Sequence, residues 1–172
     1  TLSTDSLYEK LAVFFDWTNG GLGHAPKFPM PPVLNFVLSY YIKSQNSRTG
    51  KYIELTLQKM ALGGIYDHLD GGFCRYSVDA AWKVPHFEKM LYDNGQLLSL
   101  YAKAHSIFKN DIYKHVCEGI VDFALSELYK DGLFYSALDA DSEGVEGKYY
   151  VWTSAEIEAV LGIEGEEFSR FY

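Results

Sequence analysis

The stretch GGFCRYSVDAAWKVPHFEKM, residues 71–90, decides the fold, because it is the second of three loops that follow one another in the same order along the chain. The first is GGLGHAPKFP at 20–29, and the third is DGLFYSALDADSEGVEGKYYVW at 131–152. The three recur at intervals of about 50 and about 60 residues, a period typical of stacked helical hairpins. We therefore expect an all-α ring or solenoid of hairpins whose enlarged loops collect at one end.

Apolar periodicity and capping residues outline the helices between these loops. Pro31 and Pro32 fit the first turn of one helix, and Pro85 predicts the start of another that runs to about residue 108. Asn110 predicts the cap of the next helix. Two strand-like segments in the third loop predict a small β-hairpin near 133–152.

Composition excludes several classes of protein. With 172 residues, 48% hydrophobic and 22% charged, the chain is globular rather than disordered. A net charge of −8 and a pI near 5.0 repel a phosphate backbone, so nucleic acid is not an expected partner. The longest apolar stretch, 33–42, is far shorter than the roughly 18 residues of a membrane span, and Asn35 and Ser39 interrupt it.

The cysteines and the amino terminus bear on location. Cys74 and Cys117 form no C-x-x-C motif, so neither a disulfide framework nor a zinc knuckle is expected, and a reducing cytoplasm fits. The start TLSTDSLYEK has neither an initiator Met nor the pattern of a signal peptide. We expect a cytoplasmic protein, of which this chain is a piece.

The densest polar group is PHFEKMLYDN, residues 85–94. On the helix predicted from Pro85, His86, Lys89 and Asp93 share one face, and the helix dipole favours a neutral imidazole that can accept a proton. Glu88 lies close by. The alternative is that Lys89 and Asp93 form only an i,i+4 ion pair.

Carboxylates also gather in DADSEGVEG, residues 139–147. They imitate the first half of an EF-hand loop, but Tyr150 stands where the bidentate Glu belongs, so no metal is expected. Asp139 or Asp141 facing Glu88 across a cavity would give the paired carboxylates of glycoside chemistry. Solvated turn residues are the alternative.

The first two loops add candidate ligand-binding residues. Those of the second loop combine acid, base and flat rings: Asp70, Arg75, Tyr76 and Trp82. Such groups suit a polyhydroxylated ligand, whose C–H faces stack on rings while its hydroxyls form hydrogen bonds. The alternative is that Tyr76 and Trp82 only fill the interior at the closed end of the ring of hairpins. In the first loop, His24 and Lys27 are candidates for contact with an anionic group.

The segment GGIYDHLDGGFCRYSVDAAWKVPHFEKMLYDN, residues 63–94, resembles the thioredoxin-domain-containing family typified by spermatogenesis-associated protein 20. GGLGHAPKFPMPPVL at 20–34 and LFYSALDADSEGVEGKYYVWTSAEI at 133–157 resemble the same family in the same order. In that family a thioredoxin-like domain precedes a six-hairpin glycosidase-like (α/α) toroid, related to sugar 2-epimerases and several glycoside hydrolases. The resemblance implies that residues 1–172 form the N-terminal half of the toroid, about three hairpins.

The resemblance also implies what lies outside the chain. The thioredoxin-like domain and the later hairpins would be missing, so the isolated piece is expected to be inactive, with exposed hairpin faces open to dimerisation. It places a cavity where the loops meet, with these candidates around it: His24, Lys27, Asp70, Arg75, His86, Glu88, Lys89, Asp139 and Asp141.

Two functions stay open. In the first, the toroid binds or processes a small carbohydrate without a cofactor. His86 transfers a proton, Glu88 with Asp139 or Asp141 supplies carboxylates, and Tyr76 and Trp82 stack on the sugar. In the second, the domain is a non-catalytic scaffold that holds a thioredoxin-like domain in a redox or protein-quality role.

Overall fold

The computed structural model describes residues 3–170, which divide into a first compact unit ending at Ala140 and a second beginning at Asp141. Helices take up about half of these residues, and the rest includes short antiparallel strand pairs. The all-α expectation is therefore only roughly right. No helix among residues 3–170 is long and apolar enough to cross a membrane.

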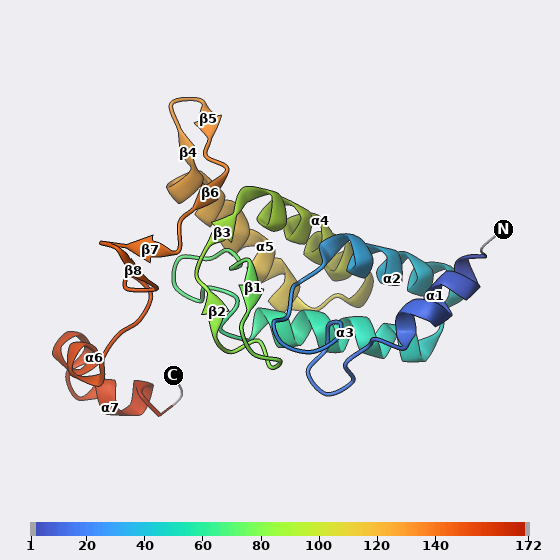
Figure 1. Ribbon diagram of the computed structural model, residues 1–172, viewed down its shortest axis with the longest axis horizontal. Coiled ribbons are helices and arrows are strands. Elements are labelled where there is room, and N and C mark those ends of the chain that lie inside the picture. The colour runs from blue at the N-terminus through green and yellow to red at the C-terminus, as the bar shows by residue number, and fades with distance from the viewer. Residues whose placement is uncertain (1–2, 171–172) are drawn as a thin grey trace. The chain divides into compact units, whose positions relative to one another are not determined.

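The elements of the first unit follow one another along the chain (Figure 1). Its helices are α1 (Thr4–Ala12), α2 (Pro31–Ser44), α3 (Ser47–Ala61), α4 (Leu91–Phe108) and α5 (Asp111–Phe123), which continues into a π-helical turn, Ala124–Leu128. Its strands are β1 (Tyr76–Ser77), β2 (Pro85–His86), β3 (Lys89–Met90), β4 (Tyr129–Lys130), β5 (Leu133–Phe134) and β6 (Ala137–Leu138).

Two helical hairpins, α2–α3 and α4–α5, form the frame of this unit. Each turns in the same way, through one residue with left-handed backbone and an asparagine that caps the next helix. Gln45 (φ 54°) and Asn46 make the first turn, and Lys109 (φ 56°) and Asn110 make the second, as predicted for Asn110. The hairpins pack side by side, α2 on α4 and α3 on α5, which confirms the predicted stacking of helical pairs.

The long loop between α3 and α4 is part of the core. Its aromatic residues Tyr66, Phe73 and Trp82 are buried together with residues of the helices. Tyr101 of α4 is fully buried and donates a hydrogen bond to the carbonyl of Leu57 (2.8 Å), which ties α4 to α3. Burial of these rings fixes the course of a loop that has little regular structure of its own.

The helix predicted from Pro85 begins six residues later, at Leu91. Residues 85–90 are extended because they pair with neighbours on both sides: β2 pairs antiparallel with β1, and β3 with β6. The predicted helical face with His86, Lys89 and Asp93 is therefore wrong, and so is the argument that the helix dipole acts on His86. Figure 1 shows β1 to β3 at the end of the first unit where α3 ends and α4 begins.

A small hairpin does lie within 133–152, as predicted, but the two segments expected to form it do not pair with each other. Leu133–Phe134 pairs with β4, Ala137–Leu138 pairs with β3, and the segment 148–152 forms no strand. The second unit holds a separate short hairpin of β7 (Asp141–Ser142) and β8 (Val145–Glu146), followed by α6 (Ser154–Leu161) and α7 (Glu164–Phe168).

Candidate functional site

Three rings lie in a row where the first two loops meet. Lys27 and Ser77 exchange two backbone hydrogen bonds of 2.8 Å, which brings Phe28 beside Tyr76 with 4.8 Å between ring centroids. Tyr76 on β1 lies opposite His86 on β2, and their rings stack at 4.8 Å with 13° between planes. Phe28 is 42% exposed, so the row offers an accessible aromatic face of the kind that binds the C–H face of a sugar.

Glu88 joins Arg75 to His86. Arg75 donates from Nη1 to Glu88 Oε2 (2.8 Å) and from its backbone N–H to the Glu88 carbonyl (2.8 Å). His86 Nε2 lies 3.8 Å from the same carboxylate oxygen. The hydrogen bond to Glu88 raises the pKa of Arg75, so the guanidinium stays charged. All three side chains are partly exposed, so each has surface within reach of a ligand.

Asp93 supplies a carboxyl group with unusual protonation. It lies in the first turn of α4 and is half-buried. Burial, together with repulsion from Glu88, raises the pKa of Asp93 to about 6, against the attraction of Arg75. A carboxyl that keeps its proton close to neutral pH can act as a general acid. We call Arg75, Tyr76, His86, Glu88 and Asp93 the His86 cluster.

A buried ion pair closes the first loop. Lys27 Nζ lies 2.6 Å from Asp16 Oδ2 and donates a second bond to the Gly20 carbonyl (2.8 Å). Asp16 also accepts from the backbone N–H groups of Thr18 and Asn19. Burial alone would raise the pKa of Asp16, but the bonds from Lys27 and the two amides lower it well below its usual range.

The second loop is closed by the same arrangement. Lys89 Nζ lies 2.7 Å from Asp67 Oδ2 and donates to the Gly71 carbonyl (2.9 Å), while Asp67 Oδ1 accepts from the N–H groups of Leu69 and Asp70. In both loops the ammonium lies over an aromatic ring, 5.4 Å from the Trp82 centroid for Lys27 and 4.6 Å from the Phe123 centroid for Lys89. We call the two pairs the loop braces.

The braces change the interpretation of three candidate residues. Lys27, Lys89 and Trp82 are 0 to 1% exposed, and the Trp82 indole donates to the Asn19 carbonyl (2.8 Å). Their polar groups bond within the protein rather than facing a ligand. Lys89 still matters for the His86 cluster, because it fixes the backbone next to Glu88.

The other candidates lie at different places. His24 and Asp70 are exposed, and Asp70 donates its backbone N–H to the brace carboxylate of Asp67. Asp139 follows Leu138, which pairs with Lys89, and extending that register by one residue sets Asp139 opposite Glu88. Asp141 belongs to the second unit, on β7.

The described part of the chain has no cluster of metal ligands and no reactive thiol. No group of three or more His, Cys, Asp or Glu side chains within residues 3–170 is placed to hold a metal ion. Cys74 and Cys117 are free thiols, and burial raises the pKa of Cys74 to about 12. Cys74 is therefore not a reactive thiolate at neutral pH.

Sequence reasoning missed Asp16 and the bracing role of Asp67, and the alternative Lys89–Asp93 ion pair does not form, because Lys89 pairs with Asp67. A signal for the first two is present in the chain: FDWTNGGL at 15–22 aligns with YDHLDGGF at 66–73, with an Asp four residues before each Gly-Gly pair. The altered pKa of Asp93 has no such signal, because it depends on burial and on the fold that brings Glu88 near it.

No family model matches the sequence. Over 165 residues it is 42% identical to spermatogenesis-associated protein 20 of Mus musculus, covering 90% of this chain and 21% of that protein. Over 170 residues it is 41% identical to an uncharacterized protein of Caenorhabditis elegans, covering 91% and 23%. The chain thus spans about one-fifth of the length of the curated relatives it matches.

Solved structures with a similar fold include two sugar epimerases. The cellobiose 2-epimerase of Bacillus thermoamylovorans has a TM-score of 0.68 at 11% identity, with 86% of this chain and 44% of that one covered. A sugar epimerase from a ruminal bacterium has a TM-score of 0.67 at 13% identity, with 96% and 46% covered. An alpha-amylase from Clostridium perfringens has a TM-score of 0.57 at 10% identity, covering 98% and 51%. This chain therefore has a fold similar to about half of each of these toroid proteins, and its sequence is similar to one segment of spermatogenesis-associated protein 20.

Proposed function

We propose that the His86 cluster binds a small carbohydrate and transfers a proton to or from it in the whole protein. The observation that carries the proposal is that Glu88 bonds to Arg75, approaches His86 and helps to raise the pKa of Asp93 to about 6, all beside a row of stacked rings. Carboxyl, guanidinium and imidazole groups around an aromatic face match the hydroxyls and C–H faces of a sugar.

Each residue of the cluster has a role in this proposal. Asp93 is the acid, His86 exchanges the proton, and Glu88, oriented by Arg75, accepts hydrogen bonds from sugar hydroxyls. Phe28, at the exposed end of the row, offers the stacking face, and Tyr76 holds it beside His86. Asp139 is the second carboxylate partner, supported by its register position opposite Glu88. Lys27, Lys89 and Trp82 take no part, because they are buried in the protein.

The fold neighbours support a carbohydrate rather than another ligand class, since two of them are named as sugar epimerases. Epimerisation and glycoside hydrolysis both need acid and base groups on a sugar, so the cluster is compatible with either. The half-toroid, the thioredoxin-like partner domain, dimerisation and a cytoplasmic location stay predictions.

Isothermal titration calorimetry of the full-length protein with cellobiose, maltose, glucose and mannose tests the proposal. We expect saturable binding of at least one sugar, loss of that binding in His86→Ala, and unchanged binding in His115→Ala. His115 is an exposed histidine of α5 that lies outside the cluster, so it controls for the general loss of an imidazole. Absence of binding across the panel, or equal binding by His86→Ala, would contradict the proposal.

The loop braces favour a second function, a scaffold without chemistry that holds a thioredoxin-like domain. In two of the loops, buried polar groups bond to each other and stabilise the fold instead of facing a ligand. For a scaffold, His86→Ala is expected to lower the melting temperature while no sugar binds to either protein. The calorimetric panel and a melting curve of the same two proteins therefore separate the two functions.

A further inference from the structure

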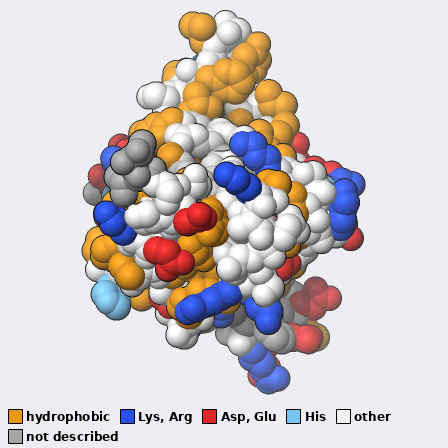
Figure 2. All heavy atoms as spheres, turned by 90° about the vertical axis from the view of Figure 1, so that its right-hand side faces the viewer, with side chains coloured by type: hydrophobic (Ala, Val, Ile, Leu, Met, Phe, Trp, Pro, Cys, Tyr) orange, Lys and Arg blue, Asp and Glu red, His pale blue; other side chains and the backbone are white. Residues whose placement is uncertain are grey.

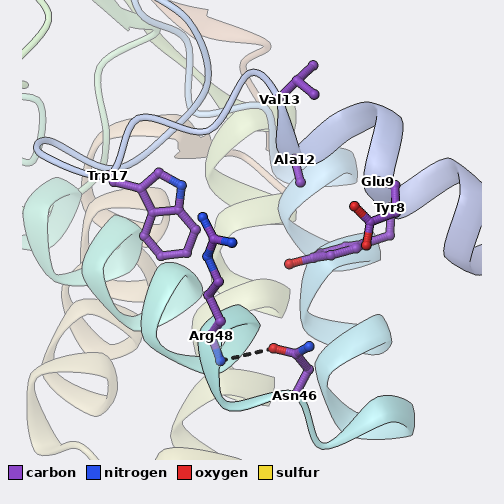
Figure 3. A pocket seen from close by; sticks show the side chains of 7 residues that line it. All are labelled: Tyr8, Glu9, Ala12, Val13, Trp17, Asn46 and Arg48. Carbon is purple, nitrogen blue, oxygen red and sulfur yellow. Dashed lines mark hydrogen bonds between the residues drawn. The ribbon is translucent and has the colours of Figure 1, made fainter.

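A hollow separate from the His86 cluster lies between α1, the first loop and the start of α3. Its volume is about 240 Å³. Seven residues line it: Tyr8, Glu9, Ala12, Val13, Trp17, Asn46 and Arg48 (Figure 3). Drug-sized ligands occupy roughly 300–1,000 Å³, so this hollow suits a smaller molecule.

Arg48 is held in place without a counter-ion. Its guanidinium carbon lies 4.8 Å from the centroid of the Trp17 ring, a cation–π contact that limits its motion. No carboxylate within residues 3–170 pairs with it. The nearby amides of α3 are already used, since Asn46 Oδ1 accepts from the N–H groups of Arg48 and Thr49 at 3.0 and 3.1 Å. The guanidinium is thus a charged donor that is not used within the described residues.

Tyr8 supplies a second donor. Its hydroxyl oxygen accepts a bond from Thr49 Oγ1 (2.7 Å), and no acceptor for its own hydrogen occurs within residues 3–170. The side chain is 6% exposed, and its ring is stacked on Tyr40 at 4.1 Å, so the hydroxyl is rigidly placed. Figure 3 shows the Tyr8 hydroxyl and the Arg48 guanidinium facing the same hollow. Two fixed donors converging in this way suit a carboxylate.

The other side of the hollow is acidic and apolar. Glu9 lines it, is exposed, and has no ion-pair partner within residues 3–170. Ala12 and Val13 add apolar surface, and Val13 is 75% exposed. Figure 2 shows acidic and basic side chains close together on the face that carries α1. One cation and one anion without partners, beside a small apolar wall, match a ligand that carries both charges.

We propose that this hollow binds a free α-amino acid with an apolar side chain. The carboxylate accepts from Arg48 and Tyr8, the ammonium pairs with Glu9, and the side chain packs on Ala12 and Val13. A ligand with two carboxylates is disfavoured, because its second charge would meet Glu9. The inference is independent of the His86 cluster, since no residue is shared between them.

Two-dimensional NMR of the intact chain with three matched probes tests this site. L-Leucine carries both charges, leucinamide lacks the carboxylate, and 4-methylpentanoate lacks the ammonium. We expect leucine to give saturable shifts at the Trp17 indole and the Arg48 side chain, with a dissociation constant on the order of 1 mM. Each truncated probe is expected to bind about tenfold more weakly, as fits the loss of one charge-assisted hydrogen bond.

Three variants complete the test. Arg48→Gln is expected to weaken leucine binding about tenfold, and Glu9→Gln to weaken leucine but not 4-methylpentanoate. Lys51→Gln is the control, because Lys51 is an exposed cation of α3 that does not line the hollow. The proposal is overturned if leucine gives no saturable shift in the millimolar range, if leucinamide binds as tightly as leucine, or if Arg48→Gln leaves binding unchanged.

Discussion

Lys89 and Asp67 form a buried ion pair, with 2.7 Å between Nζ and Oδ2 and with side chains that are 2% and 13% exposed. Lys89 adjoins Glu88 in the chain, and Asp67 begins the turn that contains Gly71. The pair therefore ties β3, which directly follows Glu88, to the far end of the same loop. Because both charges are withdrawn from water, each depends on the other.

Lys89→Met is expected to lower the free energy of unfolding by about 3–5 kcal/mol, because it leaves the Asp67 carboxylate buried without a partner. Urea denaturation followed by circular dichroism measures the loss. The double variant Lys89→Met/Asp67→Asn is expected to recover part of it, since no charge then stays unpaired. If the losses in free energy of unfolding from Lys89→Met and Asp67→Asn are simply additive in the double variant, Lys89 and Asp67 do not stabilise each other and the prediction is wrong.

Lys27→Met is expected to cause a similar loss of stability, because Lys27 is also buried against a carboxylate. The two variants should differ at the His86 cluster. Only Lys89→Met removes an ion pair that holds the backbone next to Glu88. We therefore expect only that variant to change the titration of Asp93, which carboxyl carbon NMR measures. An equal change in the Asp93 titration in both variants would show that the Lys89–Asp67 pair has no particular effect on the His86 cluster.

Asp93 should titrate with an apparent pKa of about 6. An unfolded Asp has a pKa of about 3.9, so folding favours the protonated form. The resulting stability is complete below about pH 3.9 and is lost as the pH rises through 6. At pH 7, Asp93→Asn is therefore expected to be more stable than the native chain, by about 1 kcal/mol after allowance for partial exposure.

The control for this prediction is Asp122→Asn, which changes an exposed Asp of α5 outside the cluster. Its stability should follow the native pH dependence between about pH 4 and pH 8. If Asp93 titrates near the ordinary value of about 3.9, the role of this residue as an acid is wrong.

Acid should weaken the braces. Burial opposes ionisation of Asp67, but the hydrogen bond and charge of Lys89 outweigh it and lower the pKa of Asp67. A carboxylate with a lowered folded-state pKa contributes stability that is present above about pH 3.9 and is lost as the pH falls through the folded value. Melting temperatures are thus expected to fall below about pH 4, with a shallower slope in Asp67→Asn.

Gly21→Ala and Gly72→Ala are expected to destabilise the chain by about 2 kcal/mol or more each. Both glycines have positive φ, 72° and 80°, and an added Cβ would lie 2.5 Å from a ring carbon of Trp82 or 2.6 Å from one of Phe123. Gly95→Ala is the control. Gly95 lies in α4 with open space around it. Because alanine favours a helix more than glycine does, the change is expected to raise the free energy of unfolding by roughly 0.5–1 kcal/mol.

The helix that starts at Pro31 could be predicted from sequence, and the one predicted from Pro85 could not. Pro31 is followed by residues that have no strand to pair with, so the local preference decides. Pro85 begins a strand instead, because tertiary pairing with β1 and β6 overrides the local signal. β6 is distant in sequence from β3, and no pattern near Pro85 reveals that pairing.

The candidate site shows the same limit. Four of the polar residues predicted for a site in the second loop, Arg75, Tyr76, His86 and Glu88, contact one another, while their role stays a prediction. Residue type alone did not reveal which lysines are buried. Lys27 and Lys89 differ from exposed lysines only through the carboxylates that the fold brings to them.

The two braces close loops of different length with the same chemistry. The ends joined are 11 residues apart in the first loop and 22 in the second. Doubling the length of a loop costs only about 0.6 kcal/mol of closure entropy. The additional residues of the second loop include β1 and β2, and with them Tyr76 and His86. Tyr76 and His86 thus lie on an insert held by an ion pair of the same kind as the one in the first loop, and the first loop is a natural position into which a different insert can be grafted.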